Sequence, residues 1–142
     1  MRNPDPFAPP KKQRPVRQNS LLWILEPLER DAEYTRRKMF GCDAAYLDGL
    51  LYLVVADREA PWNGVMVCTS HERQAALIAD LPNLVPHPEL GKWLYLPQDD
   101  EAFEGTAAQL VALALARDPR FGVVPKPKAR RRKPWRTGDD AG

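Results

Sequence analysis

The 142-residue sequence has only two cysteines, only two histidines and no long apolar run. Cys42 and Cys68 are too few for a disulfide framework, and two such thiols are typical of small buried residues in a reducing compartment. The longest apolar run, Leu50–Ala56, is far shorter than the roughly 20 residues that span a bilayer. The proline-rich, basic N-terminus lacks the apolar segment of a secretion signal. We therefore expect a cytoplasmic protein without membrane contact.

Spacings that mark common catalytic and cofactor sites are also missing. The eight glycines are scattered, and none forms a phosphate-binding loop before a helix. Cys68 and His71 are separated by two residues and form one closely spaced pair of possible zinc ligands. Structural zinc sites normally have two such pairs, and here only the distant Cys42 and His87 could complete the set. Cys68 and His71 could instead be a nucleophile and its base if they lay within hydrogen-bonding reach. We expect no cofactor, no metal and no catalytic residues, and hence a non-enzymatic protein.

Charge is distributed unevenly along the chain, although the formal net charge is only +2. Residues 1–19 carry five basic residues against one acidic residue. Segment 20–124 has nine basic and sixteen acidic residues, a net charge of −7. A phosphate backbone would be repelled by this acidic body and attracted by the basic ends. The C-terminal end carries seven basic residues, namely Lys126, Lys128, Arg130, Arg131, Arg132, Lys133 and Arg136.

The first half of the chain predicts a basic arm, a helix and a meander of strands. Residues 1–19 are rich in proline and lack hydrophobic periodicity, so we expect them to be disordered. Ser20 is placed to cap a short or irregular helix that contains Pro27. Extended structure begins near Lys38, and Asp48-Gly49 is typical of a two-residue hairpin turn. Strands at 44–47, 50–56 and 65–68 then form a three-strand antiparallel meander.

The second half predicts two helices and one short strand. Thr69 and Glu72 are spaced as a capping box before a helix at 70–81. A proline-rich irregular stretch leads to a strand at 93–96. Acidic residues at 99–101 favour the start of a last helix, which Pro119 ends. Its apolar face consists of Phe103, Ala107, Leu110, Val111 and Ala114. We therefore predict a two-layer α+β domain at 20–122 and a disordered basic tail at 123–142.

The order of these elements and one short motif resemble the N-terminal domain of the TfoX family. The motif is Met39-Phe40-Gly41, which leads to the hairpin at Asp48-Gly49, and Cys42-Asp43 departs from the glycine and aromatic residue that commonly follow it. That domain is similar in fold to the YjbR-like proteins, with helices packed around one antiparallel sheet. The resemblance implies a bacterial regulatory or nucleic-acid-associated protein. For Met39 and Phe40 we favour a structural role over contact with a ligand: they are apolar residues that lead into a strand, and Gly41 allows close approach of the backbone.

Three hypotheses for function remain open. In the first, the tail binds DNA or RNA phosphates without sequence preference, with Trp135 stacking on a base, and the domain contacts a protein partner. In the second, the domain is a protein-interaction or chaperone-like module and the tail only improves solubility. In the third, Cys68 is a reactive thiol. Trp62, Trp93 and Tyr95 are candidates for a recognition groove at a sheet edge, although core packing is favoured for Trp93.

Overall fold

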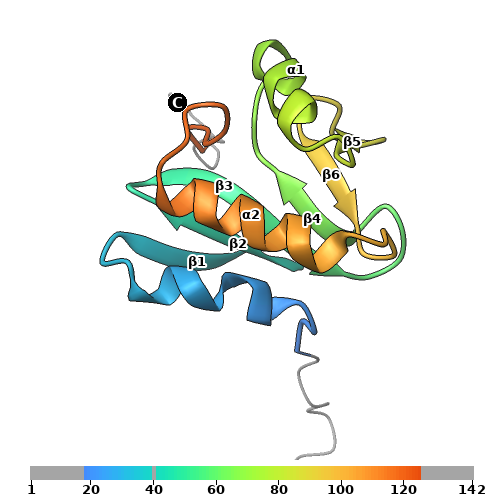
Figure 1. The fold of residues 1–142 in the computed structure, drawn as a ribbon. Helices are drawn as coiled ribbons and strands as arrows, with labels where there is room; N and C mark the ends of the chain where they lie inside the picture. The colour runs from blue at the N-terminus through green and yellow to red at the C-terminus, as the bar shows by residue number, and fades with distance from the viewer. Residues whose placement is uncertain (1–17, 40, 126–142) are drawn as a thin grey trace, which may run out of the picture.

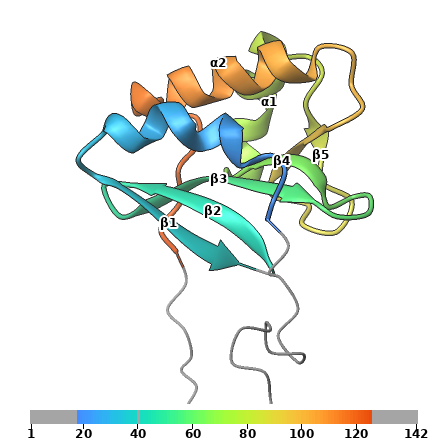
Figure 2. The same cartoon turned by 90° about the horizontal axis from the view of Figure 1, so that it is seen from below.

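The structure is a computed structural model that describes residues 18–39 and 41–125. Within these residues six strands form one antiparallel sheet, and two α-helices and a 3-10 helix lie on one of its faces (Figures 1 and 2). The predicted two-layer α+β fold is confirmed. The elements are η1 (Leu22–Arg30), β1 (Tyr34–Met39), β2 (Cys42–Leu47), β3 (Leu50–Asp57), β4 (Asn63–Val67), α1 (His71–Asp80), β5 (Val85–Pro86), β6 (Leu94–Pro97) and α2 (Phe103–Leu115).

The meander has one strand more than the sequence predicts. The sheet order is β1-β2-β3-β4-β6-β5, so the first four strands follow one another directly. The additional strand, β1, pairs with β2 from Tyr34–Leu47 to Met39–Cys42. Its four central residues are exposed and polar, so it lacks the apolar alternation that predicts a strand. Charged residues are usual on an edge strand, where they discourage pairing with other chains.

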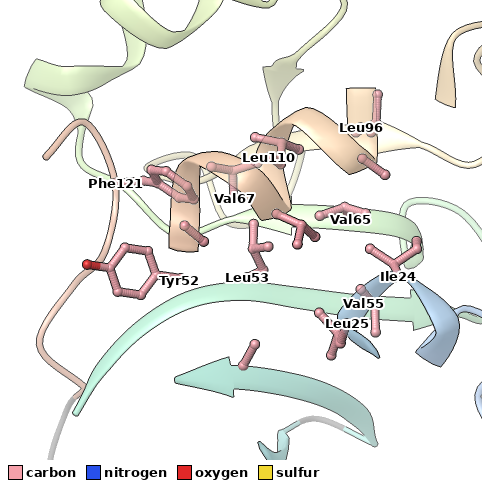
Figure 3. Close-up of a cluster of buried hydrophobic side chains, with 14 of the residues drawn as sticks. Ile24, Leu25, Tyr52, Leu53, Val55, Val65, Val67, Leu96, Leu110 and Phe121 are labelled. Carbon is pink, nitrogen blue, oxygen red and sulfur yellow. The ribbon is translucent and has the colours of Figure 1, made fainter. Parts of the chain in front are cut away.

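The main core lies between the sheet and its helices (Figure 3). Leu53 and Val55 of β3 and Val65 and Val67 of β4 point from the sheet toward α2 and η1. The predicted apolar face of α2 is buried throughout, which is consistent with its helical spacing. Each fully buried leucine or valine side chain here contributes roughly 1.5–3 kcal/mol through burial of apolar surface.

Two predicted helix caps are not formed. The 3-10 helix begins at Leu22, and the backbone N–H of Ser20 donates to the Asp57 carboxylate at 2.6 Å. Thr69 does not form a capping box with Glu72, because its hydroxyl donates to the carbonyl of Arg120 at 2.6 Å and no side-chain bond caps α1. Ser20 and Thr69 therefore connect segments that are distant in the sequence, and neither caps the start of a helix.

Arg117 links the end of α2 to the residue that follows η1 and to the β2–β3 turn. It has a positive φ of 57°, and its guanidinium donates to Asp31 at 2.8 Å and to Asp48 in the β2–β3 turn at 2.7 Å. The hydrogen bonds from Arg117 hold the pKa of Asp31 below its usual value. Asp48 and Gly49 have positive φ values of 55° and 79°, as the predicted two-residue turn requires.

Both ends of the described chain bond to the sheet. Asn19 Nδ2 donates to the Val55 carbonyl at 2.8 Å and to the Asp43 carboxylate at 3.1 Å. Val123 exchanges two backbone hydrogen bonds with Leu51, at 2.8 and 2.9 Å. Asn19 and Val123 lie just outside the predicted bounds of 20–122. No helix among the described residues is long and apolar enough to cross a bilayer.

Candidate ligand-binding groove

The face of the sheet opposite the helices carries a second, smaller apolar cluster. Its buried members include Ala44 of β2, Val54 of β3 and Met66 of β4, which pair directly across the three strands. None of the described helices lies on this face (Figure 2). A groove of about 1390 Å³ opens here. We call this side of the sheet the groove face.

Strand register brings groove residues together from distant parts of the sequence. Thr35 of β1 pairs with Tyr46 of β2, and Tyr46 pairs with Leu51 of β3. Val123 pairs with Leu51 on its other side, and Trp93 directly precedes β6. Neighbouring strands lie about 4.8 Å apart, so Tyr46 and Trp93 are separated by three or four strand spacings, or roughly 14–19 Å. Both aromatic side chains are half-buried and line the groove.

The basic side chains of β1 differ according to the face on which they lie. Asp43 is buried on the helix side, where its carboxylate lies 3.8 Å from Arg36 Nε and 3.3 Å from Lys38 Nζ. Arg37 lies on the groove face, with its guanidinium carbon 5.9 Å from the centre of the Tyr46 ring. Arg37 therefore places a positive charge over an aromatic ring, whereas its two neighbours share the one buried carboxylate of Asp43.

A second positive charge comes from Lys92, which is exposed at the opposite wall. No ion pair among residues 18–39 and 41–125 includes Arg37 or Lys92. Glu89 is the one acidic residue among the described groove residues, which also include Lys38. The groove is therefore locally positive on a domain whose total charge is negative.

His87 fixes the loop that carries Lys92 and Trp93. The imidazole is 1% exposed. Its Nδ1 accepts the backbone N–H groups of Glu89 and Leu90, both at 3.0 Å, and its Nε2 lies 3.0 Å from the Pro61 carbonyl oxygen. Because Nδ1 is an acceptor, this pattern assigns the neutral tautomer in which Nε2–H donates to Pro61. The sequence offers no signal for this role, because one histidine among prolines has no periodic or spaced partner.

The C-terminal segment reaches the groove after α2 by crossing to the groove face (Figure 2). The N–H of Gly122 donates to the Cys68 carbonyl at 2.8 Å, and Arg73 Nη2 donates to the Gly122 carbonyl at 3.2 Å. Gly122 has a φ of +94°, and an added Cβ would lie 2.8 Å from the Tyr52 ring. A glycine is required here for both reasons. The chain then delivers Pro125 to the rim of the groove.

Comparison with protein-family models, with curated proteins and with solved structures finds no match to this chain. The resemblance to the N-terminal domain of the TfoX family thus rests on the short motif and the order of elements, and it stays a prediction. What the groove binds has to be inferred from its own residues.

The predicted motif residues lie near the groove in part. Met39 is half-buried and lines it, while Phe40 lies outside the described residues. Gly41 has a φ of +76° in the β1–β2 turn, and an added Cβ would lie 2.8 Å from the Arg58 guanidinium. The predicted nucleic-acid-binding residues of the tail, Lys126, Lys128, Arg130, Arg131, Arg132, Lys133 and Arg136, also lie outside the described residues.

The predicted aromatic candidates divide between the groove and its support. Trp93 lines the groove, whereas Tyr95 is buried and donates a hydrogen bond to the side-chain oxygen of Asn63. Trp62 is half-buried, and its ring centre lies 4.8 Å from that of His87. Trp62 and Tyr95 therefore position the imidazole and its loop, while Trp93 is available to a ligand.

Cys68 and His71 do not form a reactive pair in this structure. Cys68 is fully buried, and burial raises the pKa of its thiol well above the usual value. His71 is exposed at the start of α1. Burial also raises the pKa of the Cys42 thiol, so both thiols are protonated at neutral pH. Among the described residues, no three histidine, cysteine or acidic side chains are grouped so that they could hold a metal ion.

Proposed function

We propose that this chain is a non-enzymatic bacterial accessory protein that binds nucleic acid jointly through its basic tail and its groove. The observation that carries the proposal is the origin of the tail. Pro125 lines the groove, and Lys126, the first of the seven basic tail residues, follows it directly. A polymer held by the tail is therefore held next to the groove, and each contact raises the effective concentration of the other.

The distribution of charge supports this arrangement. The groove is lined by Arg37 and Lys92, which form no ion pair among the described residues, by Lys38, which is paired with Asp43, and by one acidic residue. Segment 20–124 as a whole has a net charge of −7. Many acidic residues belong to the elements on the helix side, among them Glu26 and Glu29 of η1. A phosphate backbone would be repelled from that side and attracted to the groove face.

A protein partner is the second candidate, because the groove also contains apolar side chains. Met39, Leu51 and Trp93 lie beside its basic residues. Such a lining also suits an acidic peptide with a bulky apolar side chain. In that case, partner capture would be insensitive to nuclease and to removal of residues 126–142.

The deciding experiment measures binding of labelled DNA and RNA over a series of salt concentrations. Three forms are compared: the full chain, the chain without residues 126–142, and the Arg37→Glu, Lys92→Glu double variant. We expect affinity to fall linearly on a log–log plot against salt, with a slope of about −0.7 to −0.9 per phosphate contact. Both changes should weaken binding and make this slope shallower.

Arg30→Glu is the matched control, because Arg30 is an exposed arginine at the end of η1 on the helix side. It changes net charge as each groove substitution does, but it should leave the slope nearly unchanged. The proposal is refuted if the full chain binds neither DNA nor RNA at low salt, or if tail deletion leaves binding unaltered.

A further inference from the structure

We infer that the groove face takes the unpaired bases of a single-stranded nucleic acid, in preference to duplex. This inference rests on the proposed function, and it names the class of nucleic acid that the groove selects. It is carried by the size of the groove, by two separated aromatic rings and by the apolar floor between them.

The groove is large enough to hold part of a polymer. The groove of about 1390 Å³ is larger than the roughly 300–1,000 Å³ typical of small-molecule sites. It is also open along the sheet from Thr35 of the edge strand β1 to the loop that carries Lys92. These dimensions suit a short stretch of polymer that enters and leaves at the two rims.

Two aromatic rings in the groove could stack on bases. Tyr46 and Trp93 are half-buried and lie roughly 14–19 Å apart across the sheet. Every base presents a flat face, and stacking on such rings is the usual source of sequence-tolerant binding of single strands. In a duplex these faces are already stacked on neighbouring bases and are therefore not available.

The floor between the rings separates bases from phosphates. Leu51 and Val123 lie between Tyr46 and Trp93, so a charged phosphate placed there would lose its hydration without gaining a partner. Phosphates are better placed near Arg37, whose guanidinium lies over the Tyr46 ring, and near Lys92 at the other wall. This arrangement matches a single strand with its bases turned inward. Duplex DNA, which presents phosphates outward, would contact only the two rims.

The test compares affinities for a single strand of roughly 10 nucleotides and for a duplex of the same length, using the full chain. Tyr46→Leu and Trp93→Leu remove the rings, whereas Tyr46→Phe and Trp93→Phe keep them. The control is Trp23→Leu, which removes a 45% exposed indole from η1 on the helix side. Circular dichroism and urea unfolding establish that each variant is folded.

We expect each leucine variant to bind the single strand about 5- to 150-fold more weakly, the range that corresponds to loss of one stacked base. The phenylalanine variants and the Trp23 control should retain most of their affinity. The unsubstituted protein should bind the duplex more weakly than the single strand, and these substitutions should not change its affinity for the duplex. If a leucine variant unfolds, the comparison of single strand with duplex in the parent protein still decides the question.

One outcome would overturn the inference while leaving the proposed function intact. It is equally tight binding of duplex and single strand together with unchanged affinity in folded leucine variants. If the tail alone bound nucleic acid and only an acidic peptide occupied the groove, both the inference and the joint binding proposed above would fail. A full chain that binds no nucleic acid of any kind would instead refute the proposed function itself.

Discussion

Replacing His87 with leucine tests whether one imidazole holds the wall of the groove. Leucine fills a similar volume but cannot bond, so the Glu89 and Leu90 amides and the Pro61 carbonyl each lose their partner. Three hydrogen bonds at a net 0.5–1.5 kcal/mol each would give about 1.5–4.5 kcal/mol. Since Pro88 and Glu89 are exposed, water can replace part of this bonding. We therefore expect a loss of about 2 kcal/mol in the free energy of unfolding.

The assay is equilibrium unfolding in urea, with the midpoint and the slope of the transition measured separately. His87→Asn is the matched variant, because its side-chain carbonyl is placed to accept the Glu89 and Leu90 amides as Nδ1 does. It should lose less stability than His87→Leu. The leucine variant should also weaken ligand binding, since the released loop carries Lys92 and Trp93. A change in unfolding free energy below about 0.5 kcal/mol, the usual range of neutral surface substitutions, would refute this reasoning.

Two further predictions concern the buried thiols and the glycines. Iodoacetamide should not modify Cys42 or Cys68 in the native protein at neutral pH, because burial raises the pKa of both thiols. Labelling of both should become fast in urea. Selective labelling of Cys68 in the native protein would instead support the hypothesis of a reactive thiol. Gly64→Ala should lower the free energy of unfolding by about 3 kcal/mol or more, because the new Cβ would lie 2.0 Å from the Leu96 carbonyl oxygen. Gly105→Ala in α2 is its control, since nothing lies within 4 Å of the added Cβ, and it should instead raise stability by about 0.5–1 kcal/mol in thermal or urea unfolding.

Elements that follow from a local sequence pattern were predictable. The face of α2 and the hairpin at Asp48-Gly49 each follow from one local rule, and the structure confirms both. Strand β1 could not be found in this way, because it is an edge strand with polar residues on both faces. The caps at Ser20 and Thr69 failed for a different reason. Each side chain or amide had a long-range partner, Asp57 or Arg120, that no local pattern reveals.

The groove was predictable only in part. The sequence singled out Trp93 as a candidate for a recognition groove, with core packing favoured, and Met39 as part of a short motif, and both line the groove. Arg37 and Tyr46 acquire their significance from strand register, which places them on the same face. Val123 reaches the groove only because the chain crosses the sheet after α2, and no short-range signal indicates such a crossing.

The contacts that close the fold also set the order in which it can be completed during synthesis. Arg117 bonds to Asp31 across 86 positions, and the pairing of Val123 with Leu51 joins segments almost as far apart. A ribosome adds about 5–20 residues per second, so the early strands emerge seconds before the helix that covers them. The core face of β3 and β4 therefore stays without its α2 cover until that helix has emerged. The groove is completed only when Val123 of the crossing segment pairs with Leu51. The complete groove therefore forms only after the segment that leads into the basic tail is in place.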